Sequence, residues 1–189
     1  MDLGAGDGRF VLARASARPA ELVIAVDASR DSMIETSRRA SRGHVTNALF
    51  VVSAAEQLPT TLAGRCNLLT IHFPWGSLLD AATGERPDLT ARLTALLSAS
   101  GAVRILLASS PRDRNGGRAE LNPAAVATAW ESTGLCAIAM RPATLDDATA
   151  ARSSWGKRLL SNPDPARRAW VIELERHPPS NGPRSRIEP

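Results

Sequence analysis

Three closely spaced glycines near the start of the chain are the first residues whose type and spacing could do chemistry. The segment DLGAGDGRF at residues 2–10 places Gly4, Gly6 and Gly8 at alternate positions after an aspartate. Alternate glycines allow a backbone to turn sharply after a strand, to adopt positive φ and to approach a ligand closely. The dinucleotide fingerprint requires a third glycine where this chain has Arg9. The segment therefore predicts a ligand-binding turn that does not take a dinucleotide.

A second carboxylate follows at the spacing of a nucleoside site. The run ELVIAVD at residues 21–27 is apolar and β-branched, and it predicts a buried parallel strand that ends at Asp27. An acid roughly 20 residues after a glycine turn accepts hydrogen bonds from a ribose diol in doubly wound folds. Read separately, the glycines could form a flexible turn and Asp27 could cap a helix. Together, on either side of one helical segment, they favour a nucleoside site.

The elements that must position these residues alternate between strands and helices. Helices are expected at 9–17, 30–41, 88–98 and 123–132. Strands are expected at 21–27, 48–52, 66–73 and 103–108, with a closing antiparallel pair at 135–140 and 169–175. This order predicts an α/β fold with a doubly wound, mostly parallel sheet of seven-stranded type, whose ligands bind beyond the carboxyl ends of the strands. Only Met1 and Asp2 precede the glycine turn, so we expect a truncated first strand.

Composition limits the classes of protein that fit. The 189 residues are enough for one domain, which we expect at 1–176, followed by a disordered polar tail at 177–189. No apolar run approaches a membrane span, so we expect no membrane partner. The two cysteines lack a C-x-x-C pattern, which favours reduced residues of a cytoplasmic protein. We also expect a monomer. The three histidines lack metal-binding spacing, so no metal site is expected. The net charge of +4 is compatible with a polyanionic partner or with an ordinary solvated surface.

Two Trp-Gly segments lie far apart in the chain. They are FPWGSLL at 73–79 and SSWGKRL at 153–159. Both Trp75 and Trp155 sit among turn-forming residues instead of in an apolar period, which favours exposed rings over buried ones. Two such rings could hold a flipped base between them, because each base–aromatic stack contributes about 1–3 kcal/mol. The competing interpretation is that both rings are core residues.

At these motifs the chain resembles class I S-adenosylmethionine (SAM) methyltransferases. It is most similar to the aminoglycoside-resistance 16S rRNA methyltransferases that modify N1 of an adenine in the decoding site. The resemblance rests on DLGAGDGR, on NALFVV at 47–52 with the following AAE, and on both Trp-Gly segments. It implies SAM contacts at Asp2, Gly4, Gly6, Gly8, Asp27, Ala55, Glu56, Ser77 and Ser153. It also implies that Trp75 and Trp155 hold the adenine, while the carbonyl of Pro74 could orient it.

The resemblance implies a partner as well, which is 16S rRNA within the 30S subunit. Basic residues of the late segment would meet the RNA backbone, namely Arg141, Arg152, Lys157 and Arg158. Arginines 38, 39 and 42 could extend the same surface. His72 stands where an apolar residue is expected, and we interpret it as a structural residue at a strand end.

Two other functions stay open from the sequence alone. A small-molecule SAM methyltransferase would share the glycine turn and Asp27, but would need a closed apolar pocket. A degenerate SAM-fold protein that binds RNA without turnover would be compatible with a truncated first strand. Binding of SAM separates the last possibility from both enzymes.

Overall fold

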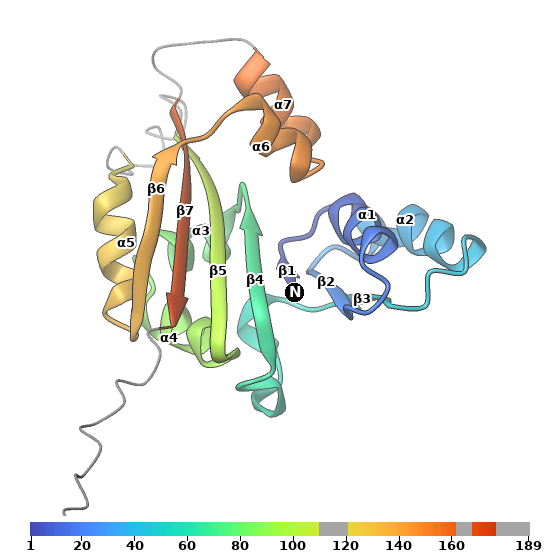
Figure 1. The fold of residues 1–189 in the computed structure, drawn as a ribbon, viewed down its shortest axis with the longest axis horizontal. Coiled ribbons are helices and arrows are strands. Elements are labelled where there is room, and N and C mark those ends of the chain that lie inside the picture. The colour runs from blue at the N-terminus through green and yellow to red at the C-terminus, as the bar shows by residue number, and fades with distance from the viewer. Residues whose placement is uncertain (110–120, 162–167, 177–189) are drawn as a thin grey trace, which may run out of the picture.

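One seven-stranded sheet organises the protein, in a computed structural model that describes residues 1–109, 121–161 and 168–176. Within these residues the strand order is β3-β2-β1-β4-β5-β7-β6 (Figure 1). The strands are β1 (Asp2–Leu3), β2 (Val23–Asp27), β3 (Ala48–Val52), β4 (Cys66–His72), β5 (Leu97–Ser109), β6 (Leu135–Pro142) and β7 (Arg168–Arg176). The first five strands pair in parallel, and β7 pairs antiparallel with β5 and β6. The predicted doubly wound, mostly parallel sheet is confirmed.

The expected short first strand is also confirmed. Strand β1 has two residues, yet it pairs on both sides, with Asp2 opposite Ala25 of β2 and Thr70 of β4. Leu3 continues the register opposite Val26 and is 1% exposed. The glycine turn therefore leaves the middle of the sheet, at the edge where parallel strands end.

Helices cover both faces of the sheet (Figure 1). The bounds are α1 (Arg9–Ala17), α2 (Arg30–Arg42), α3 (Gly76–Thr83), α4 (Pro87–Ala95), α5 (Pro123–Glu131), α6 (Leu145–Ala150) and α7 (Ser154–Ser161). Helices α1 and α2 pack against one face of β2, through residues that include Val23 and Ala25. Helices α3, α4 and α5 form the larger core on the opposite face, where Trp130 is fully buried. No helix of the described part of the chain has the length and apolar character needed to cross a membrane.

Helices α3, α6 and α7 and the start of β5 differ from the structure predicted for them. Helix α3 was not expected, because Trp75 at its N-cap supplies no capping side chain and the usual start signal is missing. Strand β5 begins at Leu97, whereas a helix was expected as far as 98. The register of β4 against β5 shifts where Cys66 pairs with Leu97, and Gly101 lies in the resulting bulge. A Cβ on Gly101 would lie 2.8 Å from the Cys66 carbonyl oxygen, so this glycine allows close strand contact and does not end a helix.

One buried carboxylate attaches the late helices to the sheet. Asp147 of α6 is 6% exposed and receives two hydrogen bonds of 2.7 Å from Arg141 of β6. Arg104 of β5 donates a further one at 2.7 Å, and Thr144 closes a capping box with the same carboxylate. The hydrogen bonds from Arg141 and Thr144 hold the pKa of Asp147 far below its ordinary value. Helices α6 and α7 are thereby fixed over the carboxyl ends of β5 and β6 and the start of β7.

The substitution Asp147→Asn tests this attachment. We expect the free energy of unfolding at pH 7 to fall by about 2 kcal/mol, the low end for a buried pair because both arginines keep partial access to solvent. Urea unfolding followed by circular dichroism measures the change. The matched control is Asp146→Asn on the exposed side of the same helix, which should shift stability by at most about 0.5 kcal/mol.

The same pair gives a prediction for acid. The pKa of Asp147 is lowered in the folded state, so its stabilisation is complete above the unfolded pKa of about 4 and is lost progressively at lower pH. The difference in stability between wild type and Asp147→Asn should therefore shrink as the pH falls from about 5 to about 3. A difference that stays constant over this range would contradict the ion-pair interpretation.

Candidate functional site

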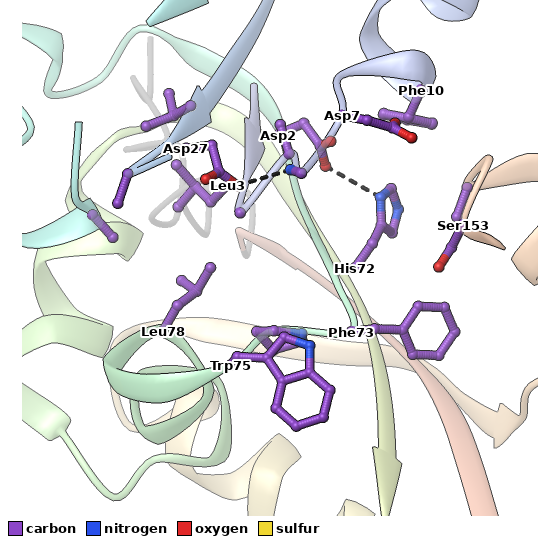
Figure 2. A pocket seen from close by; sticks show the side chains of 18 of the residues that line it. Asp2, Leu3, Asp7, Phe10, Asp27, His72, Phe73, Trp75, Leu78 and Ser153 are labelled. Atoms are coloured by element: carbon purple, nitrogen blue, oxygen red, sulfur yellow. Dashed lines mark hydrogen bonds and ion pairs between the residues drawn. The ribbon is translucent and has the colours of Figure 1, made fainter. Parts of the chain in front are cut away.

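A cavity of about 570 Å³ opens at the carboxyl ends of β1, β2 and β4 (Figure 2). Its volume is in the usual range for a small-molecule site. It joins the glycine turn, Asp27, the loop after β3, the loop after β4, and the start of α7. The predicted site residues that line it are Asp2, Gly4, Gly6, Asp27, Ala55, Glu56, Pro74, Trp75, Ser77, Arg152, Ser153, Trp155 and Arg158.

The glycine turn needs glycine for two different reasons. All three glycines have positive φ, of 66°, 56° and 71° in chain order. A Cβ on Gly4 would lie 2.8 Å from the Leu78 side chain, whereas Gly6 has open space on that side. The backbone at Gly6 can therefore be approached closely from the cavity. Gly8 lies outside the cavity lining, caps α1 and packs against Phe50.

Asp27 ties the turn to the end of β2. Its Oδ2 accepts a hydrogen bond of 2.8 Å from the Gly6 amide, and its Oδ1 accepts one of 2.8 Å from the Ser29 amide. A carboxylate has about four acceptor positions, so each oxygen keeps capacity for another donor. Asp27 lines the cavity, and its geometry fits a ribose diol as well as a structural role.

Glu56 follows the third strand on the short 3-10 turn Ala55–Gln57. A hydrogen bond from the Ser77 hydroxyl is the main cause that holds the pKa of Glu56 below its ordinary value. Arg86 lies 3.6 Å from the same carboxylate, and Arg92 donates a hydrogen bond of 2.8 Å to the backbone carbonyl of Glu56. These arginines, which the sequence analysis did not identify, fix the turn against α4. Glu56 is therefore an ionised acceptor at the cavity wall.

The two tryptophans from the Trp-Gly segments meet at the mouth of the cavity. Their ring centroids are 5.6 Å apart, with planes at 76°. Trp75 is 62% exposed, while Trp155 is half-buried and also contacts Phe73, at 5.2 Å between centroids. Neither ring lies deep in the core, and both line the cavity.

The loop after β4 places these rings through an unusual backbone. Phe73 has a φ of 50°, a conformation that non-glycine residues rarely adopt, and Gly76 follows with a φ of 57°. The Phe73 ring lies so close to Gly156 that an added Cβ there would clash with it. Gly156 therefore lets the two loops meet, whereas Gly76 supplies the positive φ at the start of α3.

A buried carboxylate and a histidine form the floor of the cavity. Oδ1 of Asp2 accepts a hydrogen bond of 2.7 Å from Thr70 and lies 3.2 Å from Nδ1 of His72. The His72 ring meets Phe10 edge to face, at 4.6 Å between centroids. His72 was expected to be structural, and the structure places it among the lining residues.

Arg9 connects the glycine turn to the late helices. Its guanidinium donates a hydrogen bond of 2.6 Å to the hydroxyl of Ser154, 145 residues away in the chain. It also forms an ion pair of 2.6 Å with Asp7. No sequence signal predicts such a contact. Two predicted RNA-binding residues, Lys157 and Arg141, do not line the cavity, and Arg141 is engaged by Asp147. The arginines of α2 do not line it either.

The arrangement can therefore hold a nucleoside between acceptors, with an aromatic pair at the entrance. The acceptors at Asp27 and Glu56 and the open backbone at Gly6 fit the ribose, adenine and tail of a cofactor such as SAM. The exposed Arg152 and Arg158 beside the rings suit a negatively charged partner.

Known proteins are similar to this chain in sequence and in fold. A family model described as NpmA: 16S rRNA (adenine(1408)-N(1))-methyltransferase matches residues 1–173. The 16S rRNA (adenine(1408)-N(1))-methyltransferase of Streptoalloteichus hindustanus is 29% identical over 177 residues, covering 87% of this chain and 81% of that protein.

Solved structures agree with the family match. The crystal structure of the 16S rRNA methyltransferase KamB superposes with a TM-score of 0.79 at 26% identity, covering 94% of this chain and 86% of that one. The antibiotic-resistance methyltransferase Kmr gives 0.70 at 30% identity, covering 93% and 85%. Because the family model spans nearly the whole chain, this protein belongs to the NpmA family of 16S rRNA (adenine(1408)-N(1))-methyltransferases.

Proposed function

We propose that this protein transfers a methyl group from SAM to N1 of an adenine in the decoding site of 16S rRNA. It acts as a monomer on the assembled, cytoplasmic 30S subunit and thereby gives aminoglycoside resistance. The observation that carries the proposal is the meeting of Trp75 and Trp155 at the mouth of a cavity that contains the glycine turn and Asp27. The family description and the titles of the relatives name the same class of reaction.

The reaction needs positioning more than acid–base catalysis. When bound, SAM supplies a methyl group that its sulfonium makes electrophilic. Adenine N1 carries an in-plane lone pair and no proton at neutral pH, so it can attack without a general base. Trp75 and Trp155 would hold the flipped ring on its two faces, and the Pro74 carbonyl would accept a hydrogen bond from the exocyclic amine. Fixing both reactants in line can supply a large part of the rate enhancement.

The remaining lining residues would contact different parts of the cofactor. Asp27 would accept hydrogen bonds from the ribose hydroxyls, and Ala55 with Glu56 would border the adenine. Ser77 and Ser153 would complete the walls, with the exposed Arg158 and Arg152 meeting RNA phosphates at the mouth. The one-domain boundary at residue 176 stays a prediction, because residues 177–189 lie outside the described part of the chain.

Methyl transfer to purified subunits tests the proposal directly. We expect tritium from labelled SAM to enter 16S rRNA of 30S subunits, with a reverse-transcription stop at one decoding-site adenine. Naked 16S rRNA is the matched control and should be a poor substrate. Absence of SAM binding in calorimetry, together with no transfer to 30S subunits, would instead favour a non-catalytic protein, and transfer to a small molecule alone would favour the other enzyme class.

The substitution Trp75→Ala tests the role of the aromatic pair. We expect methylation of 30S subunits to fall by about 10- to 100-fold, because one base stack contributes about 1–3 kcal/mol. Binding of SAM and the thermal midpoint should stay unchanged, since the ring is 62% exposed. Ile138→Ala removes a similarly exposed apolar side chain from β6 and serves as the control. Undiminished methylation by Trp75→Ala would contradict the role proposed for this ring.

The substitution Arg158→Ala tests the proposed phosphate contact. The slope of log affinity for 30S subunits against log salt should decrease in magnitude by about one. Arg65→Ala is the control and should leave the slope unchanged, because this exposed arginine precedes β4 at the end of the strand away from the cavity. Filter binding over a salt series gives both slopes, and equal slopes for wild type and Arg158→Ala would remove Arg158 from the interface.

A further inference from the structure

A nearly buried histidine inside the cavity has no part in the function proposed above. The side chain of His72 is 9% exposed, and its Nδ1 lies 3.2 Å from Oδ1 of Asp2. Thr70 donates to the same oxygen at 2.7 Å, and Phe10 packs against the ring. Asp2 and Phe10 therefore hold the ring, and Thr70 fixes Asp2.

The two ring nitrogens have different surroundings. Because Asp2 is an acceptor, Nδ1 carries the proton of the neutral ring and donates it, which leaves Nε2 as an acceptor. Among residues 1–109, 121–161 and 168–176, no hydrogen bond reaches Nε2. His72 lines the cavity, so an acceptor there without a protein partner is available to a bound ligand.

The position of His72 identifies the part of the ligand. Figure 2 shows Asp27, Asp2, His72 and Ser153 following one another across the cavity, while the Trp75 ring points to the other side. If a nucleoside were bound with its ribose at Asp27, its 5′ substituent would reach the side of the cavity that holds Asp2 and His72, away from the Trp75 ring. That substituent, and not the target base, therefore meets the histidine.

The negative charge of Asp2 indicates which group of the cofactor would bind at this end of the cavity. Asp2 is 2% exposed, and its carboxylate favours a cation beside it. The 5′ substituent of SAM carries one ammonium, on its amino-acid end. We propose that Nε2 of His72 accepts a hydrogen bond from the α-ammonium of SAM, with Asp2 and Thr70 as positioning residues for the ring. The inference rests on the proposed function.

Two substitutions separate the nitrogens of the ring. His72→Asn can keep the donor toward Asp2 but removes the acceptor that faces the cavity. His72→Gln reaches the position of Nε2 with an amide oxygen. Calorimetry uses two ligands, S-adenosylhomocysteine and its deaminated analogue, which lacks only the ammonium. Both ligands lack the sulfonium and cannot react.

We expect His72→Asn to weaken S-adenosylhomocysteine about tenfold and to leave the analogue unchanged, the usual size for a hydrogen bond to a charged group. His72→Gln should retain most of the affinity for S-adenosylhomocysteine. Equal losses for both ligands in both variants would show a purely structural histidine and overturn the inference. If wild type binds neither ligand, the proposed function fails with it, whereas the former result leaves that function standing.

Discussion

The site depends on a two-residue strand that is hydrogen-bonded on both sides. Asp2 and Leu3 pair with β2 and β4 at once, and the amide of Ala5 continues to the Val26 carbonyl at 3.0 Å. The next contact, from Gly6 to Asp27, ties the turn to the neighbouring strand end. The short strand is held because it is central and pairs with β2 and β4 on both sides. Sheet register therefore fixes Asp2 and Asp27, whereas Arg86 and Arg92 hold Glu56 on its turn.

Much of this arrangement could be predicted from the sequence, and the exceptions have physical causes. The glycine turn, Asp27 and the alternation of strands with helices follow from glycine spacing and short apolar runs, which are local signals. Helix α3 was missed because its start has no capping side chain. The partner of His72 could not be predicted, because it depends on the register that sets Asp2 opposite Thr70. The contact of Arg9 with Ser154 joins residues that only the finished fold brings together.

The late helices reach the early site through two kinds of contact. The Asp147 ion pairs attach α6 to β5 and β6, and an apolar cluster that includes Phe73, Leu106 and Leu159 packs α7 onto the end of β4. This cluster is separate from the main core, so the segment that carries Trp155 has its own packing. Substitutions in the main core and in this cluster can therefore affect stability and substrate contacts to different degrees.

The contact between the two indoles has a consequence for selectivity. The two rings contact each other edge to face, with centroids 5.6 Å apart. A base could enter between them only after that contact is broken. The aromatic contact contributes about 0.5–1.5 kcal/mol, which an incoming nucleobase must first displace. If the two rings bind the target base as proposed, a free nucleoside would bring few other contacts to offset this cost. A polyanion would also contact the exposed Arg152 and Arg158 beside the rings, so the resting contact would favour large ligands over small ones.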